Sequence, residues 1–157
     1  MTVLRYVAIP SDRAGALRAG AIDANGHAPE RKVSDGGGLP CRHCLDDVAA
    51  GAPYLVLAYR PFPAAQPYAE VGPIFVHADP CPRHDENGGL PPIVTRRETV
   101  LMRGYGQDDR IVYGTGSVVR TGDLESAAAA LLARNDIAYV HVRSASYNCF
   151  QFRIDRN

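Results

Sequence analysis

Two short cysteine motifs have the spacing of paired zinc-binding knuckles. Cys41 and Cys44 are separated by two residues, and Cys81 and His84 repeat that spacing further along the chain. Two such knuckles can offer four nitrogen and sulfur ligands to zinc in a tetrahedron, so the sequence predicts a zinc site at these four residues. No glycine follows Cys44 to form the usual tight turn. The alternative is that the cysteines are buried thiols, which behave as small hydrophobic side chains.

A cysteine and a histidine also fall in the last predicted hairpin, whose strands span residues 137–143 and 149–154. In the register that pairs Arg143 with Cys149, one face carries His141, Arg143 and Cys149, and the other carries Val140, Val142, Phe150 and Phe152. A guanidinium stabilises a nearby thiolate, and an imidazole can accept its proton. The first face is therefore a candidate catalytic site. The alternative is that the basic side chains are solvated and Cys149 only fills space.

A third candidate is a small-molecule pocket around Arg42, His77 and the irregular loop predicted over residues 78–96. An arginine can hold a carboxylate or a phosphate with two parallel hydrogen bonds. Together with His141, these residues would form a ligand-binding site. The alternative is that His77 is an ordinary side chain at the end of a strand.

The elements that must position these residues are predicted from hydrophobic periodicity. Strands are expected over residues 2–9, 54–59, 74–77 and 99–105, and a hairpin leads from the last of these to residues 110–113. Helices are expected over residues 11–21 and 123–134, with a turn or two over residues 45–50. The chain of 157 residues has the size of one ordinary domain. We therefore expect a single α+β domain over residues 1–157, with a mostly antiparallel, curved sheet and two or three packed helices.

The composition narrows the classes of partner. Lys+Arg and Asp+Glu balance at 17 each, so no basic excess favours nucleic acid or an anionic membrane. The N-terminus lacks the pattern of a secretory signal, and no apolar run is long enough to span a membrane. The expected location is the cytoplasm, where the four cysteines would stay reduced and act as metal ligands, reactive thiols or packing residues.

Three segments taken together resemble an uncharacterised bacterial family, DUF1203. They are LPCR at residues 39–42, GPIFVH at residues 72–77, and YVHVR at residues 139–143 followed by Cys149. The resemblance extends from about residue 3 to residue 156 and implies a protein without an assigned activity. Cys44 falls where other members often carry Ser or Thr. The resemblance therefore shifts interest toward a shared cluster of Cys41, His77, Cys81, His141 and Cys149.

These observations predict a protein that binds a small ligand or a metal ion. Zinc is the metal that the cysteine and histidine ligands favour. A thiol- or metal-dependent enzyme that uses Cys149 and His141, or Cys41, is the first alternative. A protein–protein interaction module is the second.

Overall fold

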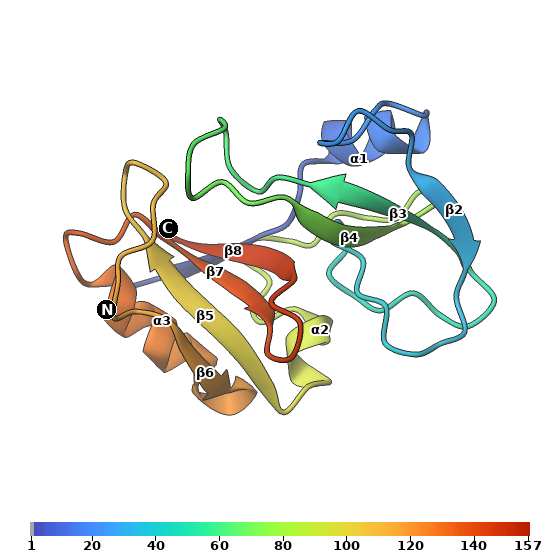
Figure 1. The fold of residues 1–157 in the computed structure, drawn as a ribbon. Helices are drawn as coiled ribbons and strands as arrows, with labels where there is room; N and C mark the ends of the chain where they lie inside the picture. Colours follow the sequence, from blue (N-terminus) through green and yellow to red (C-terminus); the bar gives the residue numbers. More distant parts are fainter. Residues whose placement is uncertain (1) are drawn as a thin grey trace.

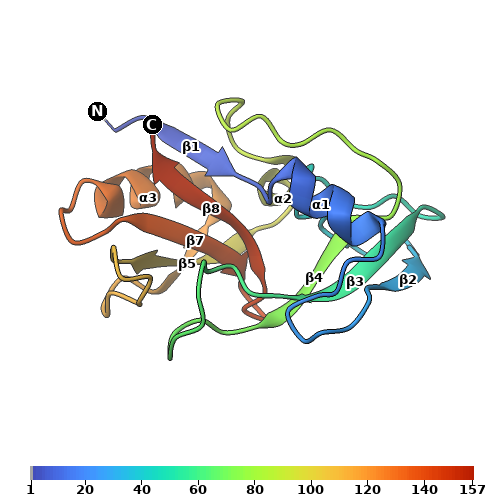
Figure 2. The same cartoon turned by 90° about the horizontal axis from the view of Figure 1, so that it is seen from above.

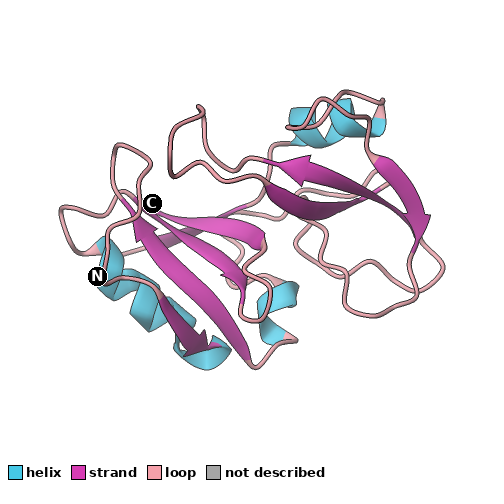
Figure 3. Cartoon of the chain, in the orientation of Figure 1, coloured by secondary structure: helices cyan, strands magenta, loops and turns pink. Residues whose placement is uncertain are grey.

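A computed structural model describes residues 2–157 and places eight strands in two antiparallel sheets (Figures 1 and 3). The larger sheet has the strand order β1 (Leu4–Val7), β8 (Phe150–Arg156), β7 (Tyr139–Ser144), β5 (Thr99–Tyr105) and β6 (Ser117–Arg120). The smaller sheet has the order β2 (Glu30–Val33), β3 (Pro53–Tyr59) and β4 (Gly72–His77). The helices are α1 (Ser11–Arg18), α2 (Pro92–Thr95) and α3 (Leu124–Leu132), and a single 3-10 turn, η1 (Thr121–Asp123), precedes α3.

The larger sheet is built on the last hairpin and on α3. Residues of β7 and β8 alternate between its two faces, as the pleat of a strand requires. One face packs against an apolar stripe of α3, formed by Leu124, Ala128 and Leu132 at intervals of four residues. This stripe is the one that helical periodicity predicts. β1 pairs with the outer edge of β8, which brings the two ends of the chain close together (Figure 2).

The smaller sheet has a hydrophobic core of its own. Ala14 and Leu17 of α1 belong to the same buried cluster as Leu55, Leu57, Ile74 and Val76 of β3 and β4. Cys41 also belongs to this cluster and is fully buried. The first candidate ligand is therefore held inside the core between α1 and the smaller sheet.

Arg42 joins the two sheets. Its backbone N–H donates to the carbonyl of Phe75 in β4 at 2.9 Å, and its Nε donates to the carbonyl of Phe150 in β8 at 2.7 Å. A further side-chain hydrogen bond reaches the carbonyl of Pro40 at 2.6 Å. Since Arg42 is only 2% exposed, its guanidinium bonds to carbonyls inside the fold rather than to solvent.

The expectation of a mostly antiparallel α+β fold with three helices is confirmed, but the expectation of one curved sheet is wrong. The apolar strands fall into two sheets rather than one. Each sheet packs against a helix of its own, α1 on the smaller sheet and α3 on the larger. The predicted turns at residues 45–50 are not helical. Residues 110–113 form only an isolated bridge, and β5 instead pairs with β6 at residues 117–120. A short helix, α2, lies inside the loop predicted over residues 78–96.

The predicted register of the last hairpin is also wrong. Val142 pairs with Phe152 and Val140 with Ile154, and a bulge at Arg143 brings Phe150 opposite it. The extra residue moves Phe150 onto the face that carries His141, and the two rings lie 4.8 Å apart. Cys149 lies before the start of β8, in the turn. In the described part of the chain, no helix is long and apolar enough to cross a membrane.

Candidate metal centre

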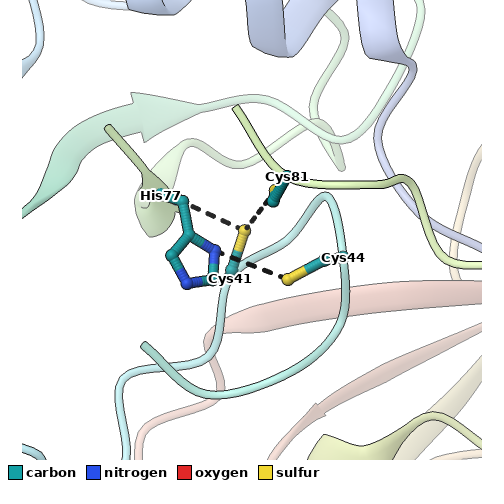
Figure 4. Close-up of side chains that lie close together, drawn as sticks. All are labelled: Cys41, Cys44, His77 and Cys81. Atoms are coloured by element: carbon teal, nitrogen blue, oxygen red, sulfur yellow. Dashed lines mark hydrogen bonds between the residues drawn. The ribbon is translucent and has the colours of Figure 1, made fainter. Parts of the chain in front are cut away.

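Four side chains from three segments converge beside β4 (Figure 4). One ligand atom each from Cys41, Cys44, His77 and Cys81 lies within 4.8 Å of the other three. The sulfurs of Cys41 and Cys81 are 3.9 Å apart, and the sulfur of Cys44 lies 3.5 Å from Nδ1 of His77. The group therefore combines three thiols and one imidazole.

These separations match the edges of a zinc tetrahedron. With Zn–S bonds of about 2.3 Å and Zn–N bonds of about 2.0–2.1 Å, two sulfurs lie about 3.8 Å apart and a sulfur lies about 3.6 Å from a nitrogen. The distances of 3.9 Å and 3.5 Å are close to both values. A disulfide would instead require sulfurs about 2.05 Å apart. The arrangement thus suits coordination and excludes a disulfide in this conformation.

The turn that carries Cys41 and Cys44 replaces the expected glycine with a leucine. Leu45 has a φ of 55°, a left-handed conformation that costs a branched side chain about 1–2 kcal/mol. Its N–H donates to the carbonyl of Cys41 at 2.9 Å, and its carbonyl accepts from Ile93 of α2 at 3.2 Å. The Leu45 side chain is fully buried in the larger core. Burial and these hydrogen bonds hold a backbone conformation that the residue type disfavours.

The other two ligands are placed by the end of β4. His77 is its last residue, and its N–H donates to the sulfur of Cys41 at 3.3 Å. Cys81 follows four residues after His77, in the loop. The chain turns back there, so that the sulfur of Cys81 also lies beside the sulfur of Cys41, at 3.9 Å. Three of the four ligands are therefore fixed relative to one strand end.

The thiols share charge among themselves. Contact with the thiols of Cys44 and Cys81 lowers the pKa of Cys41. The same contact raises the pKa of Cys44, and contact with Cys41 raises that of Cys81. In physical terms, ionisation of Cys41 opposes ionisation of the two neighbouring thiols, so the removal of further protons requires a compensating cation. A bound metal ion supplies that cation, because it holds thiols in their deprotonated form.

Two basic residues surround Cys81. Nη2 of Arg18 lies 3.1 Å from its sulfur, and Nδ1 of His43 lies 3.2 Å from it. Nε2 of His43 lies 2.9 Å from the hydroxyl of Ser11. Burial, followed by the charge of Arg18, lowers the pKa of His43. Hydrogen bonds of this kind orient ligands and hold charge around metal sites.

The structure brings together only some of the residues that the sequence singled out. Cys41, Cys44 and Cys81 meet, but His77 completes the group in place of His84. Nε2 of the His84 ring lies 3.2 Å from the carbonyl of Gly89, and the backbone N–H of His84 donates to the carbonyl of His43. The His84 imidazole is thus directed to its own loop.

The residues of the other two candidate sites are brought together only in part. Arg42 is used within the fold, and His77 belongs to the metal-ligand group, so these residues do not share a pocket with His141. His141 lies on β7, where Nη2 of Arg143 is 3.0 Å from its Nδ1. The thiol of Cys149 contacts the carbonyl of Tyr147 at 3.7 Å. Within residues 2–157, no hydrogen bond joins Cys149 to His141 as a nucleophile and a base would require.

Sequence reasoning missed the two residues that surround Cys81. Arg18 lies on α1, 63 positions from Cys81, and no local pattern signals this contact. His43 lies inside the first cysteine motif, and that position was the available signal.

One family model, described as "Protein of unknown function (DUF1203)", matches residues 38–156. No curated protein and no solved structure matches the chain. The matched region contains all four residues of the candidate metal centre. It covers most of the sequence, which confirms the resemblance noted from three short segments. The chain belongs to the DUF1203 family.

Proposed function

We propose that this protein binds one zinc ion through Cys41, Cys44, His77 and Cys81. The observation that carries the proposal is the convergence of the four ligand atoms within 4.8 Å of one another. Two separations within the group, 3.9 Å between the sulfurs of Cys41 and Cys81 and 3.5 Å between Cys44 and His77, support it, since they are close to the edges of a tetrahedron with zinc at its centre.

The ligand chemistry favours zinc over harder metals. Thiolate and imidazole ligands suit zinc, whereas magnesium and calcium take oxygen ligands. Four protein ligands leave no open position for substrate, which is typical of structural zinc sites. Cys41 is fully buried and the other three ligands are partly buried. We infer that the ion fastens the loop at Cys81 and the turn at residues 41–44 to the end of β4.

This role predicts that metal binding and folding are coupled. Ligand binding to the native state alone stabilises it in proportion to the logarithm of the free ligand concentration over Kd. The protein purified from cells grown with zinc should contain one zinc per chain by elemental analysis. Chelation should lower its melting temperature, and added zinc should restore it.

Two histidine variants provide the matched test. His77→Ala should lose stoichiometric zinc and the stabilisation that zinc confers. His84→Ala should retain both, although the sequence motif alone would make His84 the ligand. Native protein without metal, whose melting temperature does not respond to added zinc, would exclude the proposal. So would a His77→Ala variant that binds zinc as tightly as the unmodified protein.

A further inference from the structure

A pocket whose lining includes none of the four candidate metal ligands lies between the two sheets. It has a volume of about 300 Å³, which is at the small end of the range for ligand sites. Its lining includes the ends of β1 and β3 and residues of β7 and β8. The segment after β3 passes over β7 (Figure 1), so that the rings of Phe62 and His141 lie 5.1 Å apart.

His141 lines this pocket and carries an unused hydrogen-bond donor. Nη2 of Arg143 lies 3.0 Å from Nδ1 of His141. A guanidinium can only donate, so Nδ1 must accept. The ring then carries its proton on Nε2. Burial, followed by the charge of Arg143, holds the pKa of His141 well below its ordinary value, which keeps the ring in this neutral form.

Nε2 of His141 is buried and has no hydrogen-bond partner within residues 2–157. A buried donor without an acceptor loses its hydrogen bond to water and gains none in return, so native proteins rarely contain one without a reason. Because His141 is 0% exposed and also lines the pocket, a ligand oxygen on the pocket side would satisfy this donor.

Arg60 offers a second unused donor in the same pocket. Its Nε is also buried and has no partner among the described residues. The other cations of the lining are already engaged. Arg83 donates to the carbonyls of Ala8 and Ile9, and Arg153 pairs with Asp155. The lining includes no acidic residue, so its charge favours an anion.

The walls of the pocket define the rest of the ligand. Aromatic side chains of Tyr59, Phe62 and Phe150 line it together with three prolines. Such walls suit a flat or branched apolar group rather than a hydrated ion. We propose that the pocket binds a small carboxylate with an apolar body, whose oxygens accept hydrogen bonds from Nε2 of His141 and from Arg60.

Benzoate is the probe for this site. In a titration of ¹⁵N-labelled protein, benzoate should cause saturable shifts of the His141 ring signals and of the Arg60 Nε–H signal. Benzamide lacks the charge, and inorganic phosphate lacks the apolar body. We expect each of them to bind at least about tenfold more weakly, benzamide because it loses hydrogen bonds to a charged group and phosphate because it buries no apolar ring. The absence of a saturable benzoate shift, or phosphate binding of equal strength, would overturn the proposal.

Three variants locate the site. Arg60→Met and His141→Phe should each weaken benzoate binding about tenfold or more, because each removes one of the two donors. Arg31→Met, which removes an exposed arginine of β2 outside the pocket, should leave it unchanged. Benzoate affinity that survives Arg60→Met, or that falls equally in Arg31→Met, would contradict the assignment. If His141→Phe does not fold, Arg60→Met still decides the question, since Arg60 is only partly buried.

Discussion

Nη2 of Arg18 lies 3.1 Å from the sulfur of Cys81, while Nε of the same guanidinium donates to the carbonyl of His77 at 2.9 Å. One side chain from α1 therefore contacts two residues of the candidate centre that come from different segments. Three thiolates with one zinc ion would carry a net charge of about −1, which the guanidinium beside the Cys81 sulfur would compensate. The helix thus contributes to the centre without supplying a ligand.

The first prediction follows from this contact. Arg18→Met keeps much of the apolar stem of the side chain and removes its hydrogen bonds to Cys81 and His77. We expect zinc affinity to fall about 10–100-fold, the usual effect of losing an outer partner of a metal ligand. Competition with a chromophoric zinc chelator measures the change directly.

Arg13→Met is the control on the same helix. Among residues 2–157, no hydrogen bond or ion pair joins the Arg13 side chain to any of the four ligands, so its loss should leave zinc affinity unchanged. Equal affinities for the Arg18 and Arg13 variants would show that the contact between Arg18 and Cys81 has no energetic role at the centre.

Local sequence was enough to identify part of the metal centre. Cys41 and Cys44 lie in one turn, so their spacing alone brings their sulfurs together. The choice between His77 and His84 depends on where the chain runs after β4, which is set by tertiary packing. His77 lies four residues before Cys81 and ends a strand whose apolar residues belong to the core around Cys41. That position was the available signal, whereas the spacing motif favoured His84.

The pocket at His141 could not be predicted because it depends on a bulge. The alternation of apolar residues correctly placed His141 and Val142 on opposite faces. The extra residue in β8, Gln151, which lies across from the step between Val142 and Arg143, then moved Phe150 to the His141 face, and no feature of the sequence fixes the position of that bulge. The two strands of this hairpin were therefore predicted correctly, but the register between them was not.

The second prediction concerns the pH dependence of stability. His141 is buried among cations of three strands, Arg143 of β7, Arg153 of β8 and Arg103 of β5, while Glu70 pairs with Arg143 and Arg103. Its folded-state pKa lies well below the ordinary value of about 6.5. As the pH falls below about 6.5, the unfolded chain binds a proton that the folded chain does not. The free energy of unfolding should therefore decrease by up to about 1.4 kcal/mol per pH unit, until the folded-state pKa is reached.

Urea unfolding of the zinc-loaded protein between neutral pH and about pH 5 tests this. His141→Phe removes the titrating group, so its unfolding free energy should change less steeply with pH than that of the unmodified protein. His27→Gln removes an exposed histidine and should keep the original pH dependence. A His141→Phe profile parallel to that of the unmodified protein would refute the assignment.

A third prediction concerns Gly104, which lies next to the last residue of β5. A Cβ at this position would lie 2.8 Å from Cδ1 of Ile137 and 3.2 Å from Oγ1 of Thr115. Both neighbours are buried, so they cannot move into solvent. Gly104→Ala should therefore lower the free energy of unfolding by about 1–3 kcal/mol, the usual cost of overpacking.

Gly15→Ala is the matched substitution in open space. No atom lies within 4 Å of a Cβ at Gly15, which sits inside α1. Because glycine is a poor helix former, this change should raise the free energy of unfolding by about 0.5–1 kcal/mol. Denaturant unfolding of the two variants should thus give shifts of opposite sign. A neutral or stabilising Gly104→Ala would show that the strand accommodates the extra methyl group.

The last prediction tests the strained turn at the metal centre. Leu45→Ala and Leu45→Gly both remove a fully buried side chain, so each should cost about 2–5 kcal/mol or more. They differ in the backbone, because only glycine adopts a φ of 55° without a steric penalty. The glycine variant should therefore be the more stable of the two by about 1 kcal/mol. Val48 provides the comparison: it is also buried but lacks a positive φ, so Val48→Ala should be more stable than Val48→Gly. If alanine is the better replacement at both positions in urea unfolding of the zinc-loaded variants, then Leu45 is not under strain and the turn needs no glycine-like residue.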